Sequence, residues 1–394
     1  MATTVRQLRR YVQKIAKKAG MSPDETKIVT DCVVGICKSG SCKVSDIVRA
    51  LRRKIPFREE TRTFYDYLSD PKAESEKMRD AWLATVAPAA NGMPFIAVDP
   101  SDIIKPYGKD FDYLTTVRDA SAPDKCLGSG FSTVQIEATD HEHRNLPLWQ
   151  ETYSTELPEY RNLYDFVGRI VLKVLSHVGL NATWLFDRGF DGGDFYTILQ
   201  GIGITWVVRQ LGTRNVIIGN DRTILMSDLA ASLDKPHEVQ VPYVDKESHR
   251  MKSCPVRFSY TPVRLPGQDG RFSMLVVTGL RGEDMILLTN QNIRTVRQAR
   301  RIVLAYMRRW GVEEGTRVWK QKTGVEDFRV RNWTSIRRLT FFSMLAYGIQ
   351  ALWLLTRPKQ AAKLIARVKV FIEKVVFLHY RIWDGVRIAL QSGA

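Results

Sequence analysis

The sequence predicts a mixed α/β domain with a β-rich insertion, flanked by helical N- and C-terminal domains. Between residues 92 and 211, strand-like apolar runs come first and then alternate with helix-like runs, which is typical of a mixed sheet. Residues 212–290 contain short β-rich runs separated by Pro, Gly and Asp, which favours an insertion into that domain. Both ends of the chain are rich in Lys and Arg and show helical periodicity.

The 394 residues are enough for two or three domains with their own cores, and we predict four parts. Residues 1–88 form a basic helical domain, and residues 92–211 together with 291–330 form the α/β domain. Residues 212–290 form the insertion, and residues 331–394 form a helical region for dimerisation or DNA contact. A hydrophobic fraction of 44% and an aromatic fraction of 10% indicate a folded protein.

The first part, residues 1–88, is predicted to be a set of basic helices. Leu8, Val12 and Ile15 follow the helical repeat. Ser22 and Glu25 match a capping box at the start of a second helix, with a proline at its first position. We expect this part to bind a DNA end, with a helical lid that has no DNA role as the alternative.

Two aspartates follow apolar runs of the α/β domain. The run at residues 95–98 ends at Asp99, and the run at 183–186 ends at Asp187. Because carboxylates at strand ends converge readily over one sheet edge, we expect these two side chains near each other. The other predicted elements of this domain are strands at 131–139, 146–153 and 205–208 and helices at 160–178 and 194–200.

A four-residue pattern stands in the helix predicted after residue 290. Arg309, Glu313 and Lys320 lie 3, 7 and 14 positions after Tyr306, so at about 100° per residue all four share one stripe. Two cations, a phenol and a carboxylate are an unusual composition for a buried face, and they suit a polyanion held beside a metal. Arg and Lys bind phosphate oxygens, and Tyr can donate a hydrogen bond to one.

The neighbours of this stripe are predicted to divide between solvent, DNA and core. Glu314 is displaced by about 100° from Glu313, so we expect it to face solvent. Trp310 lies beside the stripe, where it would stack on a displaced base, with a structural role as the alternative. Trp319 lies on the opposite face of the helix and is expected in the core.

Asp99, Asp187 and Glu313 together form a candidate metal site. Hard Mg²⁺ prefers carboxylate oxygens, and two such ions activate an attacking oxygen and stabilise a leaving one at phosphorus. We therefore expect two Mg²⁺ ions, with Mn²⁺ as a substitute. Spacing alone does not select these three residues among 42 acidic ones. The close competitors are Asp102, Asp191, Asp194 and Glu314.

The distribution of charge suits a nucleic-acid partner. Residues 1–60 carry 14 Lys/Arg and 6 Asp/Glu, and residues 291–394 carry 21 and 6, whereas the middle has a net charge of −6. This distribution favours DNA that is bound by the two basic ends of the chain, with a metal site in the acidic middle. The alternative is that the positive charge only makes the surface soluble.

Cysteine usage and hydropathy predict a cytoplasmic protein, and a DNA partner would associate it with the nucleoid. Five cysteines make no dense disulfide framework, and the spacing of Cys32, Cys37 and Cys42 does not match a zinc motif, so buried thiols are expected. The N-terminus shows no apolar signal segment. Residues 339–356 approach the length of a membrane span but contain polar residues, so we expect a buried helix and no membrane.

Three motifs occur in the order found in a known family. The pattern Tyr-x2-Arg-x3-Glu-x6-Lys is matched without a gap by Tyr306, Arg309, Glu313 and Lys320. Residues 187–191 have the form Asp-Arg-x-x-Asp, and residues 98–107 surround the first aspartate. In these motifs the sequence resembles bacterial and archaeal DDE transposases of the insertion-sequence-four type, over about residues 92–325.

This resemblance implies an RNase H-like catalytic domain with a β insertion and with Asp99, Asp187 and Glu313 as metal ligands. The other three residues of the pattern would contact the backbone of the transposon end near the scissile phosphate. Arg188 is a weaker match for a DNA contact, and Asp191 is expected to brace its turn.

The implied activity is that of a DNA transposase, with double-stranded DNA as its partner. It would cleave the terminal inverted repeats and transfer the 3′-hydroxyl to target DNA by cut-and-paste, with a hairpin end as one variant, and a homodimer would pair the two ends. One alternative is a structure-specific nuclease or resolvase of the same fold. The other is a domesticated protein that binds DNA without catalysis.

Overall fold

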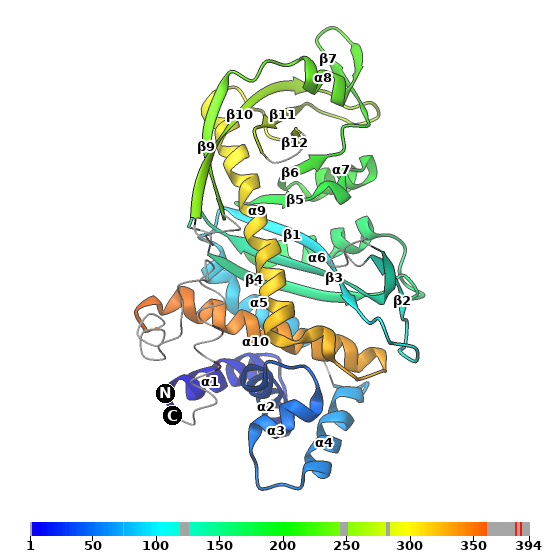
Figure 1. Cartoon of the computed structure of the whole chain (residues 1–394), viewed down its shortest axis with the longest axis vertical. Coiled ribbons are helices and arrows are strands. Elements are labelled where there is room, and N and C mark those ends of the chain that lie inside the picture. Colours follow the sequence, from blue (N-terminus) through cyan, green and yellow to red (C-terminus); the bar gives the residue numbers. More distant parts are fainter. Residues whose placement is uncertain are drawn as a thin grey trace.

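The computed structural model describes residues 2–73, 75–118, 126–142, 144–244, 251–280 and 284–360, together with Trp383 and Arg387. In Figure 1 a long twisted sheet occupies the upper part of the molecule, helix α9 runs across it, and the N-terminal helices lie at the lower end. The predicted C-terminal helices beyond residue 360 lie outside the described residues apart from those two positions.

The N-terminal part is helical, as the periodicity predicts. The capping box forms at the start of its second helix, where Glu25 N donates to Ser22 Oγ (3.3 Å) and Ser22 N donates to Glu25 Oε2 (2.9 Å). Its helices are α1 (Ala2–Lys18), α2 (Pro23–Ser39), α3 (Val44–Leu51), α4 (Phe57–Ser69) and α5 (Ser75–Ala90).

A ten-stranded mixed sheet forms the centre of the chain. Its first part is built from β1 (Phe95–Ile104), β2 (Thr115–Arg118), β3 (Leu127–Thr139), β4 (Asn145–Tyr153), α6 (Leu163–Val178), β5 (Thr183–Phe186), α7 (Gly193–Ile202) and β6 (Thr205–Gln210). Strand β1 is antiparallel to β3 and parallel to β5, and β5 is parallel to β6. Parallel β1 and β5 therefore present their carboxyl ends at one edge of the sheet.

The β-rich segment extends this sheet instead of forming one of its own. Its elements are β7 (Asn215–Ile218), β8 (Arg222–Leu225), α8 (Met226–Ser232), β9 (His237–Val244), β10 (Met251–Val263), β11 (Phe272–Thr278) and β12 (Met285–Thr289). The strand order continues from β6 through β12, β11 and β10 to β9, and only β7 and β8 pair as a separate hairpin. The sequence periodicity predicts these strands but does not reveal which neighbours they pair with.

Two long helices complete the described chain. Helix α9 (Val296–Thr323) opens with a capping box between Thr295 and Gln298 and ends at Gly324 in the left-handed conformation. Helix α10 (Trp333–Thr356) is long and apolar enough to cross a membrane, but 89% of its most hydropathic window is buried inside the protein. The predicted buried helix is therefore confirmed.

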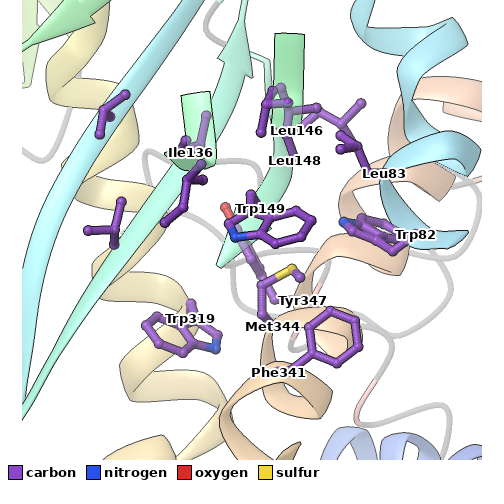
Figure 2. Close-up of a cluster of buried hydrophobic side chains, with 14 of the residues drawn as sticks. Trp82, Leu83, Ile136, Leu146, Leu148, Trp149, Trp319, Phe341, Met344 and Tyr347 are labelled. Atoms are coloured by element: carbon purple, nitrogen blue, oxygen red, sulfur yellow. The ribbon is translucent and has the colours of Figure 1, made fainter. Parts of the chain in front are cut away.

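Large apolar side chains join these helices to the sheet. Figure 2 shows Trp149 of β4, Trp82 of α5 and Phe341 of α10 facing one another, with Trp319 of α9 at the side of the cluster. Trp319 is fully buried and donates from Nε1 to Ser343 Oγ (2.8 Å), which confirms its predicted core position. The three N-terminal cysteines, Cys32, Cys37 and Cys42, are buried free thiols, also as predicted.

The first strand is longer than the sequence predicts. Asp99 does not end β1 but lies in its middle, because pairing with β3 continues from Asp99↔Gln135 to Ile104↔Gly130. Pro100 suggests a strand end in the sequence. It is tolerated here because β5 stops at Phe186, which leaves the continuation of β1 open on the β5 side, and an edge position needs no donor.

Candidate active site

The register of two parallel strands brings Asp99 and Asp187 to the same level of the sheet. The last paired residues of β1 and β5 are Ala97 and Leu185, and each aspartate lies two residues further along. Asp187 caps the short 3₁₀ helix that follows β5, accepting a hydrogen bond from Gly189 N (3.0 Å). The predicted proximity of the two aspartates thus follows from the register.

Asp99 is buried beneath the second half of α9. It is 8% exposed, and its Oδ2 accepts a hydrogen bond from Thr316 Oγ1 (2.7 Å). Burial raises the pKa of Asp99 to about 6. Arg309 and the Thr316 hydrogen bond oppose that shift, and the charges of Glu313 and Asp187 add to it. All three predicted metal ligands therefore share one electrostatic environment.

Arg309 connects two of the three acids. Its Nη1 lies 3.7 Å from Asp99 Oδ1, and its Nη2 forms an ion pair with Glu313 Oε1, one helical turn away. Burial lowers the pKa of Arg309, but Tyr306 and the carboxylates of Glu313, Asp99 and Asp187 raise it by more, so the guanidinium stays charged. Arg309 thus bridges residues that are more than two hundred positions apart in the chain.

The predicted stripe lies along one continuous helix, but its first half faces the core. Tyr306 is 1% exposed and Arg309 is 5% exposed, because the sheet packs against this side of α9. The prediction that this stripe avoids the core is wrong for both residues. In this structure both side chains are covered, and Arg309 forms ion pairs with two of the acids.

The remaining predicted DNA contacts are more open. Lys320 is partly exposed, and its ammonium donates to the carbonyl oxygen of Asp102 and lies 3.5 Å from Glu326 Oε1. Trp310, on α9, is partly buried and packs against the hydrophobic core between this helix and the sheet. Arg188 is exposed and forms no ion pair with any described residue.

Two acidic neighbours also have definite places. The side chain of Glu314 is only 14% exposed and pairs with Arg317, so the prediction that it faces solvent is wrong, whereas Glu313 is 48% exposed. Sequence spacing gives each position on the helix but not where the sheet and α10 cover it. Asp191 binds Arg214, Tyr196 Oη (2.9 Å) and a backbone amide, which confirms its predicted bracing role.

Sequence reasoning missed Arg209, a cation beside the two aspartates. It follows Val208 in β6, and Val208 is the neighbour of Phe186 in β5, so Arg209 stands next to Asp187. It is half-buried and pairs with no carboxylate among the described residues. The signal was present, because Arg209 directly follows the predicted apolar run at 205–208.

Glu137 is a second residue that the sequence did not single out. It lies on β3 opposite Ala97, on the same sheet face as Asp99, and it is fully buried. Burial raises its pKa well above the ordinary range, the hydrogen bond from Gln135 opposes the shift, and Asp99 adds to it. Gly315 allows the close approach of α9, since a Cβ there would lie 2.8 Å from a Glu137 carboxyl oxygen.

The carboxylate oxygens of Asp99, Asp187 and Glu313 are of the type that binds a hard divalent cation, but in this structure they do not lie close enough together to hold one. Three carboxylates with one bridging guanidinium leave excess negative charge that Mg²⁺ or Mn²⁺ would neutralise. Within the described parts of the chain, no three His, Cys, Asp or Glu side chains stand close enough to hold an ion. Arg309 occupies the space between Asp99 and Glu313 that such an ion would share.

Residues 138–349, just over half of the chain, match a family model described as "Transposase DDE domain". The matched region includes Asp187 and Glu313 and begins after Asp99. No similar sequence was found among curated proteins.

The solved structures that are similar in outline include one described as "Cryo-EM structure of piggyBac transposase synaptic complex with hairpin DNA (SNHP)". It has 11% sequence identity and a TM-score of 0.47, and the match covers 99% of this chain and 78% of that chain. A likeness this low says nothing about activity or partners.

Proposed function

The chain belongs to the transposase DDE domain family, and from that membership we propose that it is a DNA transposase of the insertion-sequence-four type. Its site would be Asp99, Asp187 and Glu313 on an RNase H-like sheet. The observation that carries the proposal is the placement of these acids. Two lie at one level of neighbouring parallel strands, and Arg309 holds the third against the first.

Asp99, Asp187 and Glu313 would hold two Mg²⁺ ions, with Mn²⁺ as a substitute. Bound there, the ions would supply activation of the attacking oxygen and stabilisation of the leaving oxygen during displacement at phosphorus. Arg309 would give up its contact with Glu313 when the ions bind, because both compete for the same carboxylate oxygens. Thr316 would keep Asp99 oriented through its hydrogen bond.

Cations around this edge would hold the DNA. Arg188 and Arg209 flank Asp187, and Lys320 lies further along α9, so together they would bind phosphate oxygens on either side of the reacting one. Trp310, which lies next to Arg309 on α9, would stack on a base displaced at the cut end. Residues 1–88 would bind the terminal inverted repeat, and residues 212–290 would extend the catalytic sheet.

The reaction would be cut-and-paste transposition. The chain would cleave at each transposon end, and the freed 3′-hydroxyl would attack a second phosphodiester, either in target DNA or first in the opposite strand to give a hairpin end. A homodimer would pair the two ends, with residues 331–394 serving dimerisation or DNA contact. The reaction would take place in the cytoplasm, at the nucleoid.

Strand cleavage of the inverted repeat that flanks the coding region tests this proposal. We expect Mg²⁺- or Mn²⁺-dependent cutting by the intact chain, and about a thousandfold loss in Glu313→Gln, because a metal ligand contributes several kcal/mol to the transition state. Glu314→Gln is the matched control and should cut normally. Full cleavage by Glu313→Gln would refute the site. Cutting of branched DNA without the repeat would identify a structure-specific nuclease instead.

A further inference from the structure

The loop between α3 and α4 presents apolar side chains to solvent at one extremity of the molecule. Figure 1 shows this loop at the lower end, on the far side of the N-terminal helices from the sheet. Ile55 is 40% exposed and Phe57 is 42% exposed, with the exposed Pro56 between them. Consecutive exposed apolar residues at a projecting loop indicate a surface that contacts another molecule.

The base of this loop is fixed by a buried ion-pair network. Arg53 pairs with Asp31 and lies 3.1 Å from Glu60, and both acids are almost fully buried. Arg9 also contacts Asp31, at 3.2 Å. At the preceding residue, Arg52, the chain adopts φ of +53°, a conformation that non-glycine residues seldom take. The ion pairs therefore fix the two ends of the loop, and residues 55–57 project from them.

The polar neighbours of the tip are mainly cations without acidic partners. Arg52, Lys54 and Arg58 are exposed and form no ion pair with any described residue. The guanidinium of Arg49 lies 4.9 Å from the centre of the Phe57 ring. Burial lowers the pKa of Lys38, and the positive charges of Arg9 and Arg52 lower it further, so like charges gather beside the loop.

We propose that this loop is a DNA wedge, in which Ile55 and Phe57 insert between base steps from the minor groove while Arg52, Lys54 and Arg58 bind the flanking phosphates. Proteins that kink DNA combine these two features, apolar side chains for the unstacked step and cations for the backbone. A protein partner fits less well, because a partner surface would have to neutralise three adjacent cations. The inference rests on the proposed function, since it assigns the DNA contact of residues 1–88 to five positions.

Binding and bending of end-labelled duplex DNA by the full chain test the wedge. We expect the intact protein to bind and to bring the duplex ends closer in energy transfer between dyes. Ile55→Ser with Phe57→Ser should lose the bend and at least about tenfold in affinity. Arg52→Gln with Lys54→Gln should reduce the slope of log affinity against log salt by about 1.8, the value for two phosphate contacts. The matched control is Leu172→Ser with Leu180→Ser. These leucines, in α6 and just after it, are 52% and 57% exposed, and their replacement should change neither bending nor affinity.

The outcomes separate the wedge from the proposed function. Unchanged bending and affinity in the Ile55/Phe57 variant, while the intact chain binds DNA and cleaves its repeat, would overturn the wedge alone. Loss of self-association in that variant, with DNA binding intact, would overturn it too and would identify a protein interface. An intact chain that binds no duplex DNA would overturn both proposals.

Discussion

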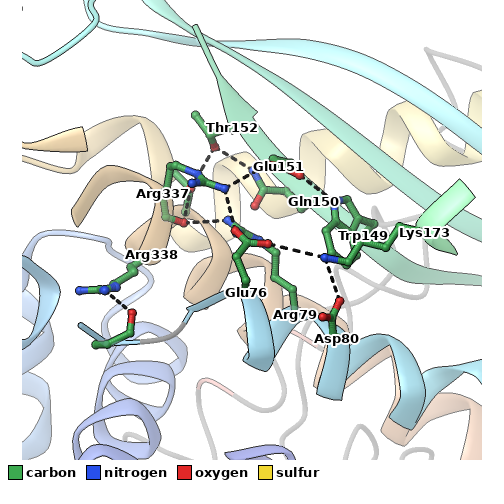
Figure 3. Close-up of polar contacts among 12 residues, drawn as sticks. Glu76, Arg79, Asp80, Trp149, Gln150, Glu151, Thr152, Lys173, Arg337 and Arg338 are labelled. Atoms are coloured by element: carbon green, nitrogen blue, oxygen red, sulfur yellow. Dashed lines mark hydrogen bonds and ion pairs between the residues drawn. The ribbon is translucent and has the colours of Figure 1, made fainter. Parts of the chain in front are cut away.

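Two networks of arginine and carboxylate groups in this molecule, each with a buried arginine, differ in their balance of charge. The first ties α5 to β4, α6 and α10, as Figure 3 shows, and it pairs Arg337 with Glu76 (2.7 Å) and Glu151 (3.1 Å). Lys173 adds a contact to Asp80 (3.1 Å), and the nearly fully buried Arg79 pairs with Glu76. Three cations therefore meet three acids, and the network needs no other ion.

The second network, around Arg309, is unbalanced. Asp99, Asp187 and Glu313 share one environment. Among the described residues, Arg309 forms ion pairs with Asp99 and Glu313, and Arg209 stands beside Asp187 without an ion pair, so three acids meet two cations. Buried charge without compensation is costly, so it persists where something else can neutralise it. The comparison associates equal charge with a structural tie in this fold and the excess of acid with the proposed site of chemistry.

The largest effect that could break this comparison is expected at Asp99. Asp99→Asn keeps the volume and the Thr316 contact but removes a ligand charge, so DNA cleavage should fall by about a thousandfold or more while thermal unfolding changes little. Glu151→Gln, in the balanced network, should leave cleavage unchanged. Equal loss of cleavage in the two variants would remove the distinction between the networks.

A loss of stability is expected in the balanced network instead. Glu76→Gln leaves the buried guanidinium of Arg79 without its carboxylate. Because Glu76 itself is 47% exposed, the free energy of unfolding should fall by about 1–2 kcal/mol, less than for a fully buried pair. Urea denaturation checks this value, and Glu59→Gln, at an exposed position of α4, provides the control. A loss below about 0.5 kcal/mol, as at a surface site, would show that this network does not hold α5 to the sheet.

Much of this organisation follows from sequence, and the remainder depends on packing across distant segments. The strand and helix types, and the continuous helix that carries Glu313, are readable from periodicity. The expected nearness of Asp99 and Asp187 is met by the register of β1 with β5, which only the fold reveals. The burial of Arg309 is not readable, because it depends on α9 packing against β1, where Asp99 lies, and no local pattern reveals that contact. Glu137 is hidden for the same reason, since only the fold places it against Gly315.

A moderate effect would sharpen the role of Arg309. Its contacts stabilise the metal-free site, so Arg309→Met should tighten Mn²⁺ binding by about tenfold through linkage. Calorimetric titration measures this directly. Arg337→Met should leave Mn²⁺ affinity unchanged, because its partners lie in the balanced network. Weaker Mn²⁺ binding by Arg309→Met would show that the guanidinium assembles the ligands instead of competing for them.

The remaining effect concerns how closely α9 is held over the site. Gly315→Ala places a methyl group 2.8 Å from Glu137 and should lower the free energy of unfolding by about 1–3 kcal/mol. Gly201→Ala, in α7 with no atom within 4 Å of the new carbon, should raise it by about 0.5–1 kcal/mol. Thermal unfolding of both variants checks the sign. Stabilisation by Gly315→Ala would contradict the close contact.

The central claim is that the acid excess at Asp99, Asp187 and Glu313 is a binding site for divalent ions. Calorimetric titration of Mn²⁺ into the intact chain, Asp187→Asn and Glu151→Gln tests it most directly, without depending on a DNA substrate. We predict that the intact chain and Glu151→Gln bind Mn²⁺ alike and that Asp187→Asn loses at least about tenfold in affinity. Equal Mn²⁺ affinity in all three proteins would contradict the claim.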